Sequence, residues 1–162
     1  MEIYDIIHGN IVIDPLAKRI IDTEEFQRLR NIKQLGCCNF VFPGTVHTRF
    51  EHSIGVYYLA KKYIDILNKQ YVYFTEREKE CISIAGLIHD MGHGPYSHLF
   101  DELFSTDKNH EYRSGELFKM MNEKYSFGIT KDEIETIINY IYPKNIDINP
   151  KEKYKYQIIS NN

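Results

Sequence analysis

Hydrophobic residues recur every three to four positions over most of the chain after residue 22, and this spacing is typical of amphipathic helices. The first residues follow another pattern. Residues 2–13 contain two short Ile-rich runs around His8-Gly9-Asn10, a triplet that is typical of a tight turn. The pattern therefore predicts a mainly α domain with a small N-terminal β-hairpin.

Capping residues indicate where the first long helices begin. Asp22 and Glu25 have the spacing of a capping box, and they predict a helix over residues 23–35 that ends at Gly36. A second helix is predicted over residues 51–70, where a broad apolar face leaves several lysines for solvent.

A second capping box, Thr75 with Glu78, precedes a run that is apolar on nearly every side. This run predicts a helix buried in the centre of the domain, ending at His89-Asp90. Further helices are predicted over residues 97–104, 110–125 and 131–142.

The C-terminal segment alternates between apolar and polar residues. Tyr154, Tyr156 and Ile158 alternate with lysines and a glutamine, which predicts a strand that needs a partner. Since the sequence stops four residues later, we expect residues 1–162 to form a single domain that is shortened at its C-terminus.

Composition narrows the class of protein. With 162 residues, 43% of them hydrophobic, the chain has the size and apolar content of one globular domain. A net charge of -3 argues against a general nucleic-acid-binding surface. The N-terminus does not resemble a signal peptide, and no apolar run approaches the roughly 18 residues of a membrane span. We therefore expect an intracellular protein, cytoplasmic or nuclear, and the bias toward Ile, Lys, Asn and Tyr suggests an AT-rich genome such as a viral one.

Histidines gather in one part of the sequence, between residues 47 and 110. His89 and Asp90 stand where the apolar helix ends, and His52 at the start of the preceding helix is the natural third metal ligand. This mixed donor set suits a divalent ion such as Mn, Fe, Zn, Ni or Mg, whereas Ca would require more oxygen ligands. A bound metal can lower the pKa of water toward about 7, so the pattern predicts hydrolysis.

Two more features fit hydrolysis of a phosphate compound. Asp101 stands three residues after His98 in a predicted helix, where its carboxylate would raise the pKa of the imidazole and make it a proton donor. Arg49, three residues before His52, would suit phosphate oxygens. Any single histidine is more often structural, and it is the joint pattern that favours a metal site.

The strings Arg49-Phe-Glu-His52 and His89-Asp90-Met-Gly-His93-Gly-Pro-Tyr-Ser-His98 resemble the HD superfamily of metal-dependent phosphohydrolases. Within it, the sequence is most similar to deoxynucleoside triphosphate triphosphohydrolases of the SAM-and-HD-domain type. The resemblance runs from about residue 5 to the end of the chain and implies an HD-domain helical bundle.

The resemblance implies a role for each matching residue. The implied metal ligands are His52, His89 and Asp90, and the implied acid/base group is His98, Asp101 and His110. The implied contacts to the substrate phosphates are Arg49, His93 and His98. The implied contacts to the sugar are Gln34 and Leu35. A regulatory guanine-nucleotide pocket is implied at Asp22, Gln27 and Arg30, which are otherwise read as a helix cap and two solvated helix residues.

The implied reaction is attack by hydroxide on the α-phosphorus of a dNTP, which gives a deoxynucleoside and inorganic triphosphate. The family also has a fourth metal ligand, an Asp, beyond the point where this sequence stops; Asp132, Glu133 and Asp147 are the weak substitutes within it. Three hypotheses stay open: a dNTP hydrolase, a non-catalytic nucleotide-binding remnant, and an HD phosphohydrolase that acts on another nucleotide. If the regulatory pocket is used, subunits should pair, because a second chain is needed to close it.

Overall fold

The computed structural model describes residues 1–70, 73–104, 108–143, 148–150 and 152–160. The predicted hairpin is confirmed: β1 (Glu2–Asp5) pairs antiparallel with β2 (Gly9–Val12). The Asp5 carboxylate accepts the backbone N–H groups of residues 7 and 8, both at 2.8 Å, and Gly9 has a φ of +72°. The turn therefore spans residues 6–8, slightly earlier than predicted.

The segment between the hairpin and the first long helix differs from the prediction. Helix α1 (Pro15–Ile21), which was not predicted, begins with a proline whose fixed φ suits the first helical position. The helix predicted over 23–35 is instead the short α2 (Glu24–Gln27) followed by the 3₁₀ turn η1 (Arg28–Asn31). Its cap is Thr23, whose side chain accepts the N–H of Phe26, and not Asp22.

The predicted helix ends early because the next residues pair with a distant segment. The N–H of Arg49 donates to the Ile32 carbonyl (2.8 Å), and the N–H of Gln34 donates to the His47 carbonyl (3.0 Å). These bonds hold residues 32–34 extended beside the start of α3. The residues between them form a surface loop that includes η2 (Cys38–Phe40).

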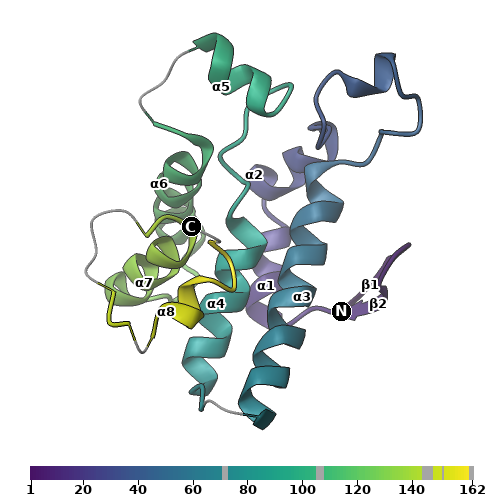
Figure 1. Cartoon of the computed structure of the whole chain (residues 1–162). Helices are drawn as coiled ribbons and strands as arrows, with labels where there is room; N and C mark the ends of the chain where they lie inside the picture. Colours follow the sequence, from purple (N-terminus) through teal and green to yellow (C-terminus); the bar gives the residue numbers. More distant parts are fainter. Residues whose placement is uncertain (71–72, 105–107, 144–147, 151, 161–162) are drawn as a thin grey trace.

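Two long helices form the centre of the molecule: α3 (Arg49–Gln70) packs against α4 (Glu76–Ile88) (Figure 1). Both predicted helices are present, and the Thr75–Glu78 capping box forms as expected. Residues 81–88 are all buried, which agrees with the apolar character of this run on every side. Because His89 and Asp90 directly follow this buried helix, α4 determines their position relative to the core.

Helices α5 (His98–Phe104), α6 (His110–Tyr125) and α7 (Lys131–Ile141) follow close to their predicted bounds. Helix α7 packs against both α4 and α6. The predicted C-terminal strand is wrong: residues 153–156 form a short helix, α8 (Lys153–Tyr156), which packs on α7. Its Tyr156 ring contacts the Tyr140 ring, so its apolar residues pack on a helix and not beside a strand.

In Figure 1, α5 and the loop that carries η2 project from the same end of the helical body. The buried core runs through α1, α3, α4, α6 and α7. None of the described helices has the length and apolar composition that a membrane span requires.

Candidate metal centre

The three predicted ligands come from two helix ends. His52 lies in the first turn of α3, while His89 and Asp90 follow α4 directly. The Nδ1 atom of His89 donates to the Gly86 carbonyl at 2.8 Å. Because a carbonyl can only accept, Nδ1 carries the proton and Nε2 keeps its lone pair free for a ligand.

The ligand atoms converge on one point. His52 Nε2 lies 3.2 Å from His89 Nε2 and 3.3 Å from Asp90 Oδ2, and His89 Nε2 lies 3.4 Å from the same oxygen. Ligands placed about 2.1 Å from a transition metal are about 3.0 to 3.4 Å apart, depending on whether the geometry is octahedral or tetrahedral. These three residues could therefore hold one divalent ion without rearrangement.

Electrostatics keep two of the ligands, His52 and Asp90, in their metal-binding protonation states. Burial, together with the neighbouring His89, lowers the pKa of His52 to about 4, so its imidazole is neutral near pH 7. Burial alone would raise the pKa of Asp90, but His93, His89 and Arg49 hold it well below its usual range. The surroundings thus favour a neutral imidazole at His52 and an ionised carboxylate at Asp90.

Arg49 lies beside the ligands and is only 1% exposed. Its guanidinium forms an ion pair with Asp90 through Nη1, and Nε donates to Ser97 Oγ at 2.9 Å. Nη2 donates to the Gln34 carbonyl at 3.4 Å. The arginine therefore places a buried positive charge directly next to the predicted metal position.

A second cluster flanks the first on the other side of Asp90. Ligand-type atoms of four residues lie within 4.8 Å of one another: His93, His98, Asp101 and His110. Asp90 Oδ1 faces this cluster, 3.5 Å from His93 Nε2 and 3.9 Å from His110 Nε2. The His93 and His110 rings stack with centroids 3.9 Å apart. The structure thus brings the predicted acid/base residues next to the predicted metal ligands.

Asp101 has one partner inside this cluster and one outside it. Its carboxylate forms ion pairs with Nδ1 of His110, at 3.5 Å, and with Arg113. A ligand-type atom of His98 also lies within 4.8 Å of it, so the predicted effect of Asp101 on His98 stays a prediction. Both ion-pair partners belong to α6. Burial, with the adjacent His93, lowers the pKa of His110 to about 4, so this imidazole is neutral near pH 7.

Several residues that the sequence did not single out hold the turn after α4. Arg28 donates to the carbonyls of Met91 and, at 2.8 Å, His93, while Arg113 donates to the Gly92 carbonyl at 2.9 Å. Three consecutive carbonyls of this turn are therefore held by two arginines. Their spacing in the sequence gives no signal, since these contacts join residues 21 to 65 positions apart.

A family model described as "HD domain" matches residues 49–159, which include both histidine clusters. This chain belongs to the HD-domain family. Its similarity to individual proteins extends further toward the N-terminus. It is 43% identical to "Putative HD domain-containing protein L394" of Acanthamoeba polyphaga mimivirus, over 96% of this chain and 38% of that protein.

Other relatives of this HD domain are named for an activity. The chain is 41% identical to the "Deoxynucleoside triphosphate triphosphohydrolase SAMHD1 homolog" of Dictyostelium discoideum, over 99% of this chain and 32% of that protein. It is 55% identical to human "Deoxynucleoside triphosphate triphosphohydrolase SAMHD1", over 63% of this chain and 17% of that protein. The chain thus spans about a third of the length of the mimivirus and Dictyostelium relatives.

Of the two predicted sugar-contacting residues, Gln34 contacts Arg49 through its backbone carbonyl. Gln34 is half-buried, and its Oε1 atom is buried without a hydrogen-bond partner among the described residues. Leu35 is 47% exposed. Gln34 ends the extended segment that pairs with the start of α3, and Leu35 follows it directly. Their contact with a sugar stays a prediction.

The three predicted regulatory residues lie at or near the surface. Gln27 and Arg30 contact each other at 2.8 Å, and the Arg30 guanidinium stacks 3.5 Å from the centre of the Phe50 ring. Asp22 instead pairs with Lys18. No contact joins Asp22 to the other two among the described residues, so their regulatory role stays a prediction.

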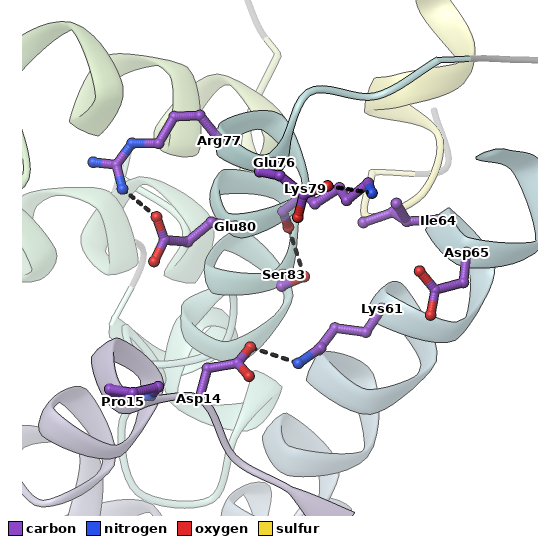
Figure 2. Close-up of a pocket in the computed structure, with 10 residues that line it drawn as sticks. All are labelled: Asp14, Pro15, Lys61, Ile64, Asp65, Glu76, Arg77, Lys79, Glu80 and Ser83. Atoms are coloured by element: carbon purple, nitrogen blue, oxygen red, sulfur yellow. Dashed lines mark hydrogen bonds and ion pairs between the residues drawn. The ribbon is translucent and has the colours of Figure 1, made fainter.

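A cleft of about 660 Å³ lies between the start of α1, α3 and α4, and none of its lining residues belongs to either histidine cluster. Figure 2 shows three ion pairs among its charged groups: Lys61 with Asp14, Arg77 with Glu80, and Lys79 with Glu76. Glu133 is bound to Arg77 and Asp132 is exposed at the start of α7, while Asp147 lies outside the described residues. Among the described residues, neither Asp132 nor Glu133 belongs to the group of His52, His89 and Asp90 that could hold a metal.

Proposed function

We propose that this HD domain hydrolyses deoxynucleoside triphosphates to deoxynucleosides and inorganic triphosphate in a metal-dependent reaction. The observation that carries the proposal is the convergence of His52, His89 and Asp90 at ligand spacing beside the buried Arg49. Relatives named as deoxynucleoside triphosphate triphosphohydrolases, 41% to 56% identical to this chain, support the choice of substrate.

The proposed metal ligands are His52, His89 and Asp90, with solvent or substrate in the remaining positions. A divalent ion bound there would lower the pKa of a bound water molecule and would neutralise part of the negative charge on the phosphates. The identity of the ion is left to measurement, with Mn, Fe, Zn, Ni and Mg as the candidates.

Arg49 and His93 are the proposed contacts to substrate phosphate. The Arg49 guanidinium stays charged at any working pH, and its ion pair with Asp90 keeps that carboxylate ionised. Because Arg49 is buried, its attraction for an incoming phosphate is screened less than it would be in open water. We assign the sugar contacts to Gln34 and Leu35.

His98 is the proposed proton donor to the departing 5′-oxygen. It is the exposed histidine of its cluster, while His93 is buried and His110 is held neutral near pH 7 by its surroundings. Asp101, at the start of α5, forms ion pairs with His110 and Arg113 of α6, and these ion pairs link the two helices next to His98. His110 and Asp101 therefore have a structural role in this proposal: they hold the side chains of the cluster in position around His98.

We carry the regulatory prediction into this proposal. Asp22, Gln27 and Arg30 would take a guanine nucleotide, and a second copy of the chain would close that pocket. GTP should then raise the rate of dNTP hydrolysis and the apparent molar mass together, and a mass that does not respond to GTP would contradict this part.

The experiment incubates the purified chain with each dNTP and a single divalent metal, and separates the products by ion chromatography. We expect inorganic triphosphate and deoxynucleoside in equal amounts, and loss of both with a chelator. His89→Ala should lower the rate by more than about 100-fold. His47→Ala removes an exposed histidine from the loop before α3 and should retain the rate. Nucleotide that binds without yielding product would contradict the proposal and favour a binding protein, while pyrophosphate or monophosphate as product would indicate a different hydrolysis.

A further inference from the structure

Ser97 has an unusual backbone conformation for a residue with a side chain. It directly precedes α5, and its φ of +59° follows a φ of +63° at Tyr96. Left-handed conformations are unfavourable for residues other than glycine, so surrounding contacts must maintain them. Ser97 is also only 2% exposed, which means that its hydroxyl is removed from water.

The Ser97 hydroxyl joins three segments of the chain. It accepts a hydrogen bond from Arg49 Nε at 2.9 Å and donates one to the Lys33 carbonyl at 2.7 Å. Arg49 belongs to the first turn of α3, Lys33 to the extended segment before the η2 loop, and Ser97 to the loop before α5. The hydroxyl thus accepts from one group and donates to another, and both partners are far from it in the sequence.

This bond controls where the arginine points. A guanidinium is planar and presents five N–H groups in a fixed fork, so fixing Nε fixes the directions of Nη1 and Nη2 as well. With Nε on Ser97, Nη1 meets Asp90 and Nη2 meets the Gln34 carbonyl. His98 follows Ser97 directly, so the same backbone conformation also sets the start of the helix that carries the proposed proton donor.

We propose that Ser97 is a positioning residue whose hydroxyl orients the Arg49 guanidinium toward Asp90 and the substrate phosphates. The kinetic consequence rests on the proposed dNTP hydrolysis, whereas the orientation of Arg49 can be tested without any substrate. The left-handed backbone at residues 96 and 97 places the hydroxyl between Arg49 and Lys33.

The first test observes the Arg49 Nε–H group by ¹H–¹⁵N NMR, with the signal assigned by its loss in Arg49→Lys. In the unaltered chain this proton should exchange slowly with water. Ser97→Ala should speed its exchange by about 10- to 100-fold, the range expected for the loss of a hydrogen bond to a charged group. Ser97→Gly should do the same, and because glycine adopts a positive φ freely, it keeps the test valid if the alanine variant does not fold.

Ser126 provides a matched control. It has a φ of +50° at the end of α6 and is exposed, so Ser126→Ala makes the same chemical change in a similar backbone conformation away from the site. We expect this variant to leave Arg49 Nε–H exchange unchanged. An unchanged Arg49 signal in both Ser97 variants would overturn the proposal.

The second test measures steady-state dNTP hydrolysis. Ser97→Ala and Ser97→Gly should lower kcat/KM by about 10- to 100-fold with a raised KM, and should add little further loss in an Arg49→Lys background, where the Nε–H is already absent. Wild-type kinetics in the Ser97 variants, or losses that multiply fully with Arg49→Lys, would overturn the positioning role. If the unaltered chain hydrolyses no nucleotide, the proposed function fails, and the NMR result alone then decides on Ser97.

Discussion

Replacing Gly92 with alanine tests how closely α6 presses on the turn that carries Asp90 and His93. A Cβ atom at residue 92 would lie 2.1 Å from the His110 carbonyl oxygen and 2.5 Å from the Ser114 nitrogen. Both are backbone atoms of α6, so they cannot turn aside as the end of a flexible side chain could. The alanine can be accommodated only if α6 and the turn move apart.

The size of this movement follows from the contacts. Ordinary contact begins near 3.4 Å, so the carbonyl of His110 must retreat by about 1.3 Å. Overpacking of this kind costs about 1 to 3 kcal/mol or more, which corresponds to a fall in Tm of roughly 3 to 10 °C for a domain of this size. A displacement of about 1 Å in a catalytic site can lower the rate by about 100-fold.

The assay combines thermal unfolding with the release of inorganic triphosphate. Gly44→Ala is the matched control, since nothing lies within 4 Å of a Cβ at that position and its φ lies outside the left-handed region. We expect Gly44→Ala to change Tm by less than about 2 °C and to keep its activity. A Gly92→Ala chain with the Tm and activity of Gly44→Ala would refute the close contact between α6 and the turn.

Two further predictions concern stability. Ser114→Ala removes a buried hydroxyl that accepts a hydrogen bond from the Gly92 N–H (2.8 Å) and donates one to the His89 carbonyl (2.6 Å). The substitution should lower the free energy of unfolding, measured by urea titration, by about 1 to 3 kcal/mol. An unchanged midpoint would contradict this pair of hydrogen bonds. A hydrogen bond from Arg77 lowers the pKa of Glu133 from 4.5 to about 2, so the stability that this carboxylate contributes is present above pH 4.5 and is lost as the pH falls toward 2. The difference in unfolding free energy between the unaltered chain and Glu133→Gln should therefore shrink from pH 5 to pH 2, and a difference that stays constant would contradict the ion pair.

Local signals predicted the helices well. Thr75 with Glu78 satisfies the first turn of α4 within four residues of sequence, so this pair identifies a helix start without knowledge of the fold. The structure shows the same capping box at α7, with Thr130 and Glu133. The segment 32–34 could not be predicted this way. Its extended form depends on bonds to residues 47–49, which lie on the far side of a surface loop.

The candidate site shows the same division. His89 and Asp90 are adjacent and end an apolar run, so their sequence position alone suggested a shared function. The ion pair between Asp101 and Arg113 was not predicted, because Arg113 comes from another helix. The role of Ser97 could not be predicted, since it depends on a backbone conformation and on two contacts with residues 48 and 64 positions away.

The most direct test of the metal centre is anomalous diffraction from crystals of this chain grown with Mn²⁺, combined with the metal content of His52→Ala in solution. We expect one ion per chain, about 2.0 to 2.4 Å from His52 Nε2, His89 Nε2 and Asp90 Oδ2, and loss of that ion in the variant. An ion bound elsewhere, or no ion at saturating metal, would contradict the metal centre and the hydrolysis proposed from it.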